Sequence, residues 1–186
     1  MSEHKKKKKP FALRLLKFLM DVGVFVLIVL AISYVLSTFV AQRILVHNVS
    51  MQDTLMEGDV VLMDKFSYRF RDPERFQIIC FDSDYEREGL IKRIIGMPGE
   101  TIMISHGMIF INGNQLKDVK GLTPIEDAGL AAEEIHLGED EYFVVGDNRD
   151  KSIDSRFAEV GNVKKDKIIG RAGLIIYPFN RFGMIR

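Results

Sequence analysis

The sequence contains no tryptophan and only one cysteine, Cys80, among its 186 residues. A single cysteine excludes an internal disulfide and leaves no cysteine–histidine cluster for a structural zinc ion. Five prolines and fifteen glycines are too few for a collagen-like or low-complexity chain. The hydrophobic share of 47% excludes a disordered chain. We therefore expect a folded chain with a core of ordinary size.

The chain also lacks net charge, because 26 basic side chains balance 26 acidic ones. This balance hides two unlike parts. Residues 1–43 carry eight basic and two acidic side chains, whereas residues 44–186 carry 18 basic and 24 acidic ones. The longer part is too acidic to favour nucleic acid. We expect neither a cofactor nor a metal ion, because the sequence has no glycine-rich phosphate loop and no ligand-like spacing of histidines and carboxylates.

A long uncharged segment follows a basic N-terminus. Residues 22–40 contain no charged side chain, and Lys5–Lys9 are five consecutive lysines. As a helix, this segment reaches about 28 Å, close to the thickness of the hydrocarbon core of a bilayer. Because basic residues remain on the cytoplasmic side, we expect a single-pass anchor in the cell membrane with a cytoplasmic N-terminus. A cleaved signal sequence is the alternative, but its apolar region is usually shorter.

These observations predict three parts of the chain. Residues 1–21 form a cytoplasmic basic tail and juxtamembrane segment, residues 22–40 form the transmembrane anchor, and residues 41–186 form an extracytoplasmic domain. Within the first part, Phe11–Met20 mixes basic and apolar side chains and suits a helix lying on the membrane surface. The lipid bilayer is thus an expected partner.

The extracytoplasmic part has the pattern of short strands. Runs rich in Ile, Val and Phe alternate with turn residues, which is typical of antiparallel β structure rather than of β–α–β units. The predicted strands are residues 60–64, 76–81, 90–95, 101–105, 108–112, 141–145 and 168–177. Residues 126–135 are the one segment here that suits a short helix. The fold class is therefore mainly β, a small antiparallel barrel or sandwich preceded by one transmembrane helix.

Lys92 is the first candidate for chemistry. Strand alternation places Leu90, Lys92 and Ile94 on one face of their strand and Arg93 on the other. A lysine that shares an apolar face loses affinity for its proton and can act as a general base. The alternative is that Lys92 extends its stem along the sheet and keeps its ammonium in water.

Two further segments carry polar groups that suit a site. Ser50 follows the predicted anchor and precedes a strand, although a serine in a loop is usually a turn residue. Residues 146–156, GDNRDKSIDSR, follow an apolar strand and place opposite charges two residues apart, Asp147 with Arg149 and Asp154 with Arg156. A loop braced by these ion pairs is suited to holding the hydroxyl of Ser152 in place.

Together, the anchor and these segments resemble the bacterial type I signal peptidases, in their short Gram-positive-like form. The resemblance covers nearly the whole chain in order, through SMQDTL, GDVVLMDK, KRIIGMPGE and GDNRDKSIDSR. It implies a serine protease with a Ser–Lys dyad. By position, Ser50 matches the nucleophile, Lys92 the general base, and Ser152 the serine that orients the lysine amine. Asp154 and Arg156 match a pair that braces the site.

The sequence departs from the family pattern around the nucleophile. The family usually has Pro-Ser-Gly before it, where this chain has His47-Asn48-Val49. Asn48 replaces a serine that donates a hydroxyl to the oxyanion, and we expect its amide to donate instead. Asp53 stands where the family has proline, which frees the backbone without removing a catalytic group.

The resemblance implies a membrane-bound serine endopeptidase that removes N-terminal signal peptides from secreted preproteins, cutting after small-x-small residues. Secretory preproteins are then the substrates, bound as an added strand. A membrane-tethered β module that binds partners without catalysis is the alternative, because motif matches include false positives.

Overall fold

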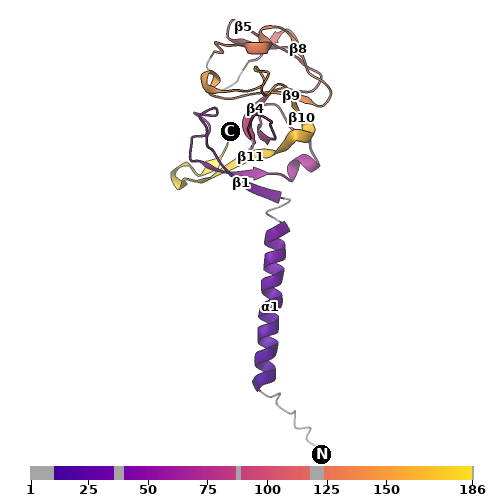
Figure 1. Ribbon diagram of the computed structural model, residues 1–186, viewed down its shortest axis with the longest axis vertical. Helices are drawn as coiled ribbons and strands as arrows, with labels where there is room; N and C mark the ends of the chain where they lie inside the picture. The colour runs from indigo at the N-terminus through magenta and orange to yellow at the C-terminus, as the bar shows by residue number, and fades with distance from the viewer. Residues whose placement is uncertain (1–10, 36–39, 87–88, 118–123, 186) are drawn as a thin grey trace, which may run out of the picture. The chain divides into compact units, whose positions relative to one another are not determined.

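The computed structural model describes residues 11–35, 40–86, 89–117 and 124–185 (Figure 1). The chain divides into two compact units between Val40 and Ala41. The first contains α1 (Phe11–Val35), which is long and apolar enough to cross a membrane. Because α1 begins at Phe11, the segment 11–20 is the first part of this helix and not a separate one. Residues 36–39 of the predicted span lie outside the described residues, so the boundaries of the anchor stay a prediction.

The second unit is mainly β, as the sequence predicts, and all its strand pairs are antiparallel. The larger sheet curls on itself (Figure 1) and has the strand order β1–β2–β11–β3–β4–β9–β10, with β12 beside β11. Its strands are β1 (Ala41–Leu45), β2 (Val60–Asp64), β3 (Ile78–Phe81), β4 (Leu90–Gly96), β9 (Glu141–Val145), β10 (Val163–Lys164), β11 (Ile168–Tyr177) and β12 (Gly183–Met184).

A smaller sheet has the order β7–β6–β5–β8 and lies at the end of the domain remote from β1 (Figure 1). It comprises β5 (Thr101–Ser105), β6 (Met108–Ile111), β7 (Asn114–Gln115) and β8 (Ile135–His136). Short 3₁₀ helices connect strands of the domain: η2 (Ser67–Arg69), η3 (Gly129–Ala132), η4 (Arg149–Lys151), η5 (Lys165–Lys167) and η6 (Phe179–Arg181). The helix predicted over 126–135 is thus reduced to one turn, η3.

The apolar side chains of the domain form three core clusters. One fills the space between the smaller sheet and the end of β9, around Ile102 and Phe143. Another packs β3, β4 and β9 together around Ile79 and Ile94. The third lies beneath the connection between β1 and β2, where Met51 and Leu55 are buried. This last cluster fixes the segment that carries Ser50.

Two features of the larger sheet decide where a site forms. β4 lies between β3 and β9, and every one of its residues is buried or half-buried. β1 lies at the end of the strand order and pairs with β2 alone within the described sheet. The backbone of an edge strand keeps unpaired N–H and C=O groups, which can accept a further strand.

Candidate active site

Ser50 lies in a tight turn between β1 and β2. The backbone N–H of Gln52 donates to the carbonyl oxygen of Val49 at 3.0 Å, and that of Leu55 donates to Met51 at 2.7 Å. Met51 and Leu55 are 1% and 0% exposed, so their burial holds the turn against the core. Asp53 has a φ of 82°. Proline cannot adopt this conformation, because its ring fixes φ near −65°.

Lys92 is buried on the face of β4 that it shares with Leu90 and Ile94, and only 1% of the residue is exposed. Its Nζ donates a hydrogen bond to Ser50 Oγ at 2.7 Å. The alternative in which Lys92 extends into water is therefore wrong. Burial lowers the pKa of Lys92 to about 8, although the carboxylates of Asp154 and Glu86 oppose the shift. The amine is poised to lose its proton close to neutral pH.

Asp154 and Arg156 form a buried ion pair behind Lys92, with side chains 0% and 1% exposed. The Arg156 guanidinium binds both carboxylate oxygens of Asp154, with Nε to Oδ1 at 2.8 Å and Nη2 to Oδ2 at 3.0 Å. It also donates to the carbonyl oxygens of Asp127, Arg149 and Ser152. A buried pair with so many satisfied donors is a rigid support, because breaking it would leave an unpaired charge in the core.

Ser152 belongs to the same network. Its hydroxyl donates to Asp154 Oδ2 at 2.7 Å, and the backbone N–H of Gly146 donates to the same oxygen at 3.0 Å. Among the residues that the structure describes, the hydrogen bond from the Lys92 amine goes to Ser50 and none joins it to Ser152. The Ser152 hydroxyl oxygen keeps its acceptor lone pairs for a nearby donor.

Asn48 contacts the nucleophile candidate directly. Its Oδ1 accepts a hydrogen bond from Ser50 Oγ at 2.8 Å and one from the backbone N–H of Ser50 at 3.3 Å. The end of the amide that faces Ser50 is therefore the acceptor. For Asn48 to donate to an oxyanion, its side chain must move so that Nδ2, and not Oδ1, points toward the oxyanion.

A second ion pair, between Arg93 and Asp147, is absent from the sequence prediction. Arg93 Nε and Nη2 bind the two carboxylate oxygens of Asp147 at 2.8 and 2.6 Å. Thr54, in the turn that carries Ser50, donates to Asp147 Oδ2 at 2.5 Å. The pairing follows from strand register, because Arg93 lies opposite Val145, two residues before Asp147.

The predicted ion pair of Asp147 with Arg149 is wrong, because the Asp147 carboxylate binds Arg93 instead. Arg149 is 2% exposed, and none of its guanidinium nitrogens has a hydrogen-bond partner within the described part of the chain. Burial lowers the pKa of Arg149 to about 10. Between these two residues, the Asn148 backbone N–H donates to the carbonyl oxygen of Ser50 at 3.0 Å, and its Nδ2 donates to Val49. The segment 146–156 thus holds the Ser50 turn by its backbone.

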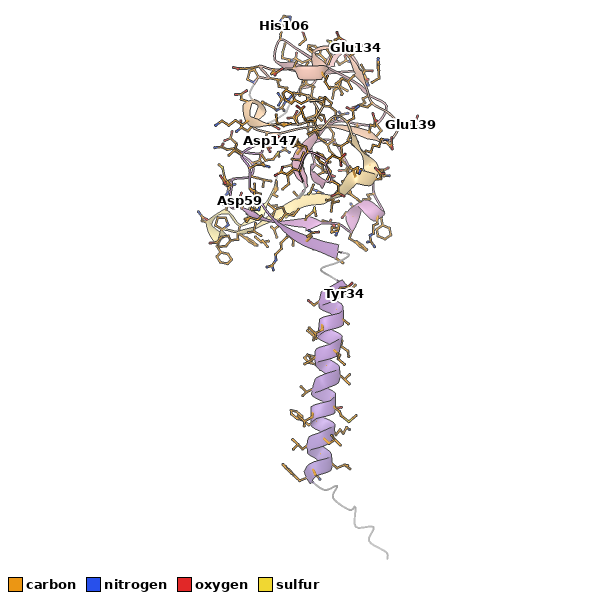
Figure 2. All side chains as sticks on the ribbon, viewed as in Figure 1. Tyr34, Asp59, His106, Glu134, Glu139 and Asp147 are labelled. Carbon is orange, nitrogen blue, oxygen red and sulfur yellow. The ribbon has the colours of Figure 1, made fainter. Side chains whose placement is uncertain are left out.

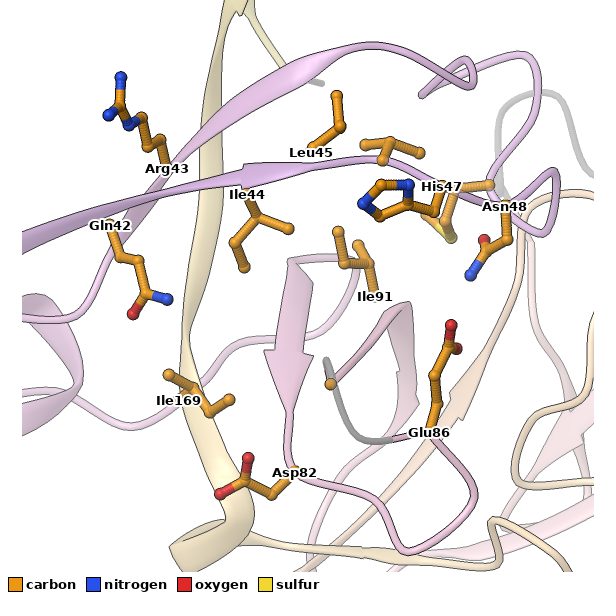
Figure 3. Close-up of a pocket in the computed structure, with 13 residues that line it drawn as sticks. Gln42, Arg43, Ile44, Leu45, His47, Asn48, Asp82, Glu86, Ile91 and Ile169 are labelled. Atoms are coloured by element: carbon orange, nitrogen blue, oxygen red, sulfur yellow. The ribbon is translucent and has the colours of Figure 1, made fainter.

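A groove of about 450 Å³ extends from this turn along the edge strand β1 (Figure 3). Its lining combines the apolar side chains of Ile44, Ile91 and Ile169 with the carboxylates of Asp82 and Glu86. Asn48, two residues before Ser50, lies at one end of it. The groove therefore runs along the edge strand to Asn48 and Met51, which lie on either side of Ser50 in the sequence.

Among the histidines, His47 lines the groove beside Asn48 (Figure 3), whereas His106 lies elsewhere. His106 lies in the part of the domain formed by the smaller sheet, as does Glu134, and both are remote from Asp147 (Figure 2). Within the described residues, no group of three or more histidine, cysteine, aspartate or glutamate side chains is arranged to hold a metal ion. The chemistry of the site is that of a hydroxyl, an amine and two supporting ion pairs.

Comparison with known proteins identifies the family. The family model "Signal peptidase, peptidase S26" matches residues 19–177. A probable signal peptidase I-2 of Synechocystis is 34% identical over 85% of this chain and 72% of its own length, and a signal peptidase I of Leptolyngbya laminosa is 35% identical over 91% and 83%. A crystal structure of a signal peptidase I from Enterococcus faecalis is 31% identical, with a TM-score of 0.42 over 54% of this chain and 97% of that chain.

The family model alone covers far more than half of the sequence, and the relatives match most of it at over 30% identity. The resemblance drawn from the motifs is therefore confirmed. The chain belongs to the signal peptidase family, peptidase S26, and is a serine endopeptidase.

Proposed function

We propose that this chain removes signal peptides from secretory preproteins by acyl transfer, with Ser50 as nucleophile and Lys92 as general base. The observation that carries the proposal is the 2.7 Å contact between the buried Lys92 Nζ and Ser50 Oγ. Neutral Lys92 takes the hydroxyl proton while Ser50 Oγ bonds to the scissile carbonyl carbon. The resulting ammonium protonates the leaving amine as the peptide bond breaks. Lys92 then activates a water that hydrolyses the acyl-enzyme.

The oxyanion is proposed to take the position that Asn48 Oδ1 occupies. That oxygen accepts hydrogen bonds from both Oγ and the backbone N–H of Ser50, so its departure frees the N–H for the developing negative charge. Turning the Asn48 amide presents Nδ2 as a second donor. A donor that faces the position where negative charge develops is worth about 100-fold or more in rate.

Ser152, Asp154 and Arg156 are proposed to position the base rather than to react. The Asp154 carboxylate fixes the Ser152 hydroxyl through a bond of 2.7 Å, and Arg156 fixes Asp154 in turn. With its proton committed to Asp154, the Ser152 oxygen is left as an acceptor for the lysine amine. This arrangement directs the lone pair of neutral Lys92 toward Ser50.

The groove beside β1 is proposed to bind the substrate as an added strand. Its position at a sheet edge supplies main-chain hydrogen bonds to a bound strand. Helix α1 is proposed to anchor the chain in the cell membrane with the basic N-terminus in the cytoplasm, because Lys5–Lys9 precede it.

Purified full-length protein in detergent, incubated with one defined preprotein, tests this function. We expect the wild type to cut after a small-x-small sequence, and Ser50→Ala and Lys92→Met each to abolish the cut. Asp84→Asn, which removes an exposed charge outside the groove, serves as a matched control and keeps activity. Cleavage by either dyad variant would rule out the dyad, and an inert wild type would favour the non-catalytic binding module.

A further inference from the structure

The groove beside β1 contains two charged groups on its otherwise apolar far wall. Asp82 and Glu86 belong to the connection between β3 and β4, and both line the groove together with Ile91 and Ile169. In the sequence, residues 82–89 hold four acidic side chains and one basic one. A substrate strand lying against β1 must therefore pass an acidic wall.

Glu86 is the carboxylate at the reactive end of this wall. Figure 3 shows its side chain directed toward Asn48, which precedes Ser50 by two residues, whereas Asp82 lies toward Ile169. The negative charge of Glu86 also raises the pKa of Lys92, so this charge acts on the proposed reacting groups. A substrate residue that reaches Glu86 consequently lies within a few residues of the scissile bond.

No hydrogen bond or ion pair occupies the Glu86 carboxylate within the part of the chain that the structure describes. When a substrate fills the groove, water leaves this carboxylate. A neutral neighbour would then leave it desolvated and unpaired, which costs free energy, whereas a cationic neighbour would pair with it. Arg43, which also lines the groove, lies at the opposite end from Glu86 (Figure 3) and does not meet this need.

We propose that Glu86 is a specificity-determining residue that favours substrates with a lysine or arginine close to the scissile bond. This inference rests on the proposed function and adds a charge preference to it. The expected preference for small residues at the first and third positions before the cut and the charge preference set by Glu86 act on different substrate positions, so a substrate can satisfy both.

The test uses the full-length enzyme in detergent and a set of matched peptides. All peptides keep alanine at the first and third positions before the cut. A single position is varied among Lys, Gln and Glu, and the varied position is moved through the second and fourth residues before the cut and the first and second after it. For the wild type, we expect kcat/KM to follow Lys over Gln over Glu at one or two neighbouring positions, with about a fivefold preference for Lys over Gln.

Substitutions in the connection separate this role from others. Glu86→Gln should bring the Lys-to-Gln ratio at that position to about one while the Gln peptide is still cut, and Glu86→Lys should reverse the preference toward Glu. Asp84→Asn is the matched control, because Asp84 lines a different pocket with Glu159 and Lys164. It removes the same charge from the same connection and should leave the ratio unchanged.

Because the ratio compares two peptides with one enzyme at one pH, it is insensitive to any change in the protonation of Lys92. If Glu86→Gln shifts the pH profile but leaves the ratio intact, Glu86 acts only on Lys92 and the proposal is overturned. Equal cleavage of Lys, Gln and Glu peptides by the wild type overturns it as well. A wild type that cuts none of the peptides overturns the proposed function together with this inference.

Discussion

Lys92 and Arg93 are consecutive residues of β4 that point to opposite faces of the strand, and both reach the turn that carries Ser50. Lys92 contacts Ser50 Oγ, and Arg93 binds Asp147, which accepts the hydroxyl of Thr54 in the same turn. One strand therefore carries the proposed base on one face and, on the other, the residue that supports the turn of the proposed nucleophile. The alternation of a strand makes this division of roles a direct result of sequence order.

Replacement of Arg93 should shift the position of Ser50, although Arg93 acts on the Ser50 turn only through Asp147 and Thr54. Arg93→Met leaves the Asp147 carboxylate, 6% exposed, without its partner. We expect unfolding free energy to fall by about 3 kcal/mol, and kcat/KM to fall by about 100-fold because the Ser50 turn shifts. Arg93→Lys should recover only part of this loss, since lysine cannot bind both carboxylate oxygens.

Arg75→Met is the matched control, because Arg75 also binds a carboxylate through two nitrogens, that of Glu100. This second pair is more exposed, at 26% and 18%, and is not part of the Ser50 network. Its loss should cost about 1 kcal/mol and little activity. Equal losses of activity in Arg75→Met and Arg93→Met would show that the effect is one of general stability.

The pH dependence of activity should follow the protonation of Lys92. Its pKa is about 8, lowered chiefly by burial and opposed by Asp154 and Glu86. Because only the neutral amine accepts the Ser50 proton, kcat/KM should rise with pH, reach half its maximum near pH 8 and level off above it. A steady-state series from pH 6 to 10 with one peptide measures this profile. A rate that is constant across the series would contradict a lysine base.

Lys92→Met should make the protein inactive and, at neutral pH, more stable. Below pH 8, folding buries a charged ammonium. Between pH 8 and the ordinary value of 10.5, the folded form has already lost the proton that the unfolded form still binds, so wild-type stability rises with pH through this window. The variant lacks this cost and should exceed the wild type by up to about 3 kcal/mol at pH 7.

The difference between Lys92→Met and wild type should shrink as pH increases from 8 to 10.5, which thermal unfolding at several pH values measures. Lys151→Met provides the control, because Lys151 is an exposed lysine. Its effect should stay within about 0.5 kcal/mol at every pH. A Lys92→Met variant that is less stable than wild type at pH 7 would mean that the contact with Ser50 outweighs the cost of burial.

The sequence predicts the strands with strong apolar patterns and misses those without them. Residues 60–64 and 101–105 match β2 and β5, because each contains three or four consecutive apolar residues. β1 escapes prediction, since the sequence AQRIL mixes polar and apolar residues at an exposed sheet edge. β8 and β10 have two residues each, too few for any period to be recognised.

The sequence likewise predicts some features of the candidate site and misses others. Alternation predicts that Lys92 or Arg93 shares an apolar face, but the contact with Ser50, 42 residues away in sequence, came only from the family resemblance. The Arg93–Asp147 pair was missed because charge patterns in a sequence reveal neighbours along the chain. That pair instead depends on β4 and β9 lying side by side.

Gly146 should be irreplaceable for a steric reason that no sequence pattern reveals. A Cβ atom on Gly146 would lie 2.3 Å from Ser152 Oγ and 2.4 Å from the carbonyl oxygen of Ser50, closer than Cβ atoms approach other atoms in proteins. Gly146→Ala must therefore displace both serines, and a shift of about 1 Å in the nucleophile costs on the order of 100-fold in rate. We expect kcat to fall by at least this factor, with KM changed less, because most of the groove beside β1 is lined by other segments. Gly173→Ala in β11 is the control: its Cβ would meet only the carbonyl oxygen of Leu62, at 4.0 Å, and full activity is expected. Activity retained by Gly146→Ala would mean that the Ser50 turn can move away from Ser152 without loss, and that close packing of these two serines does not position the nucleophile.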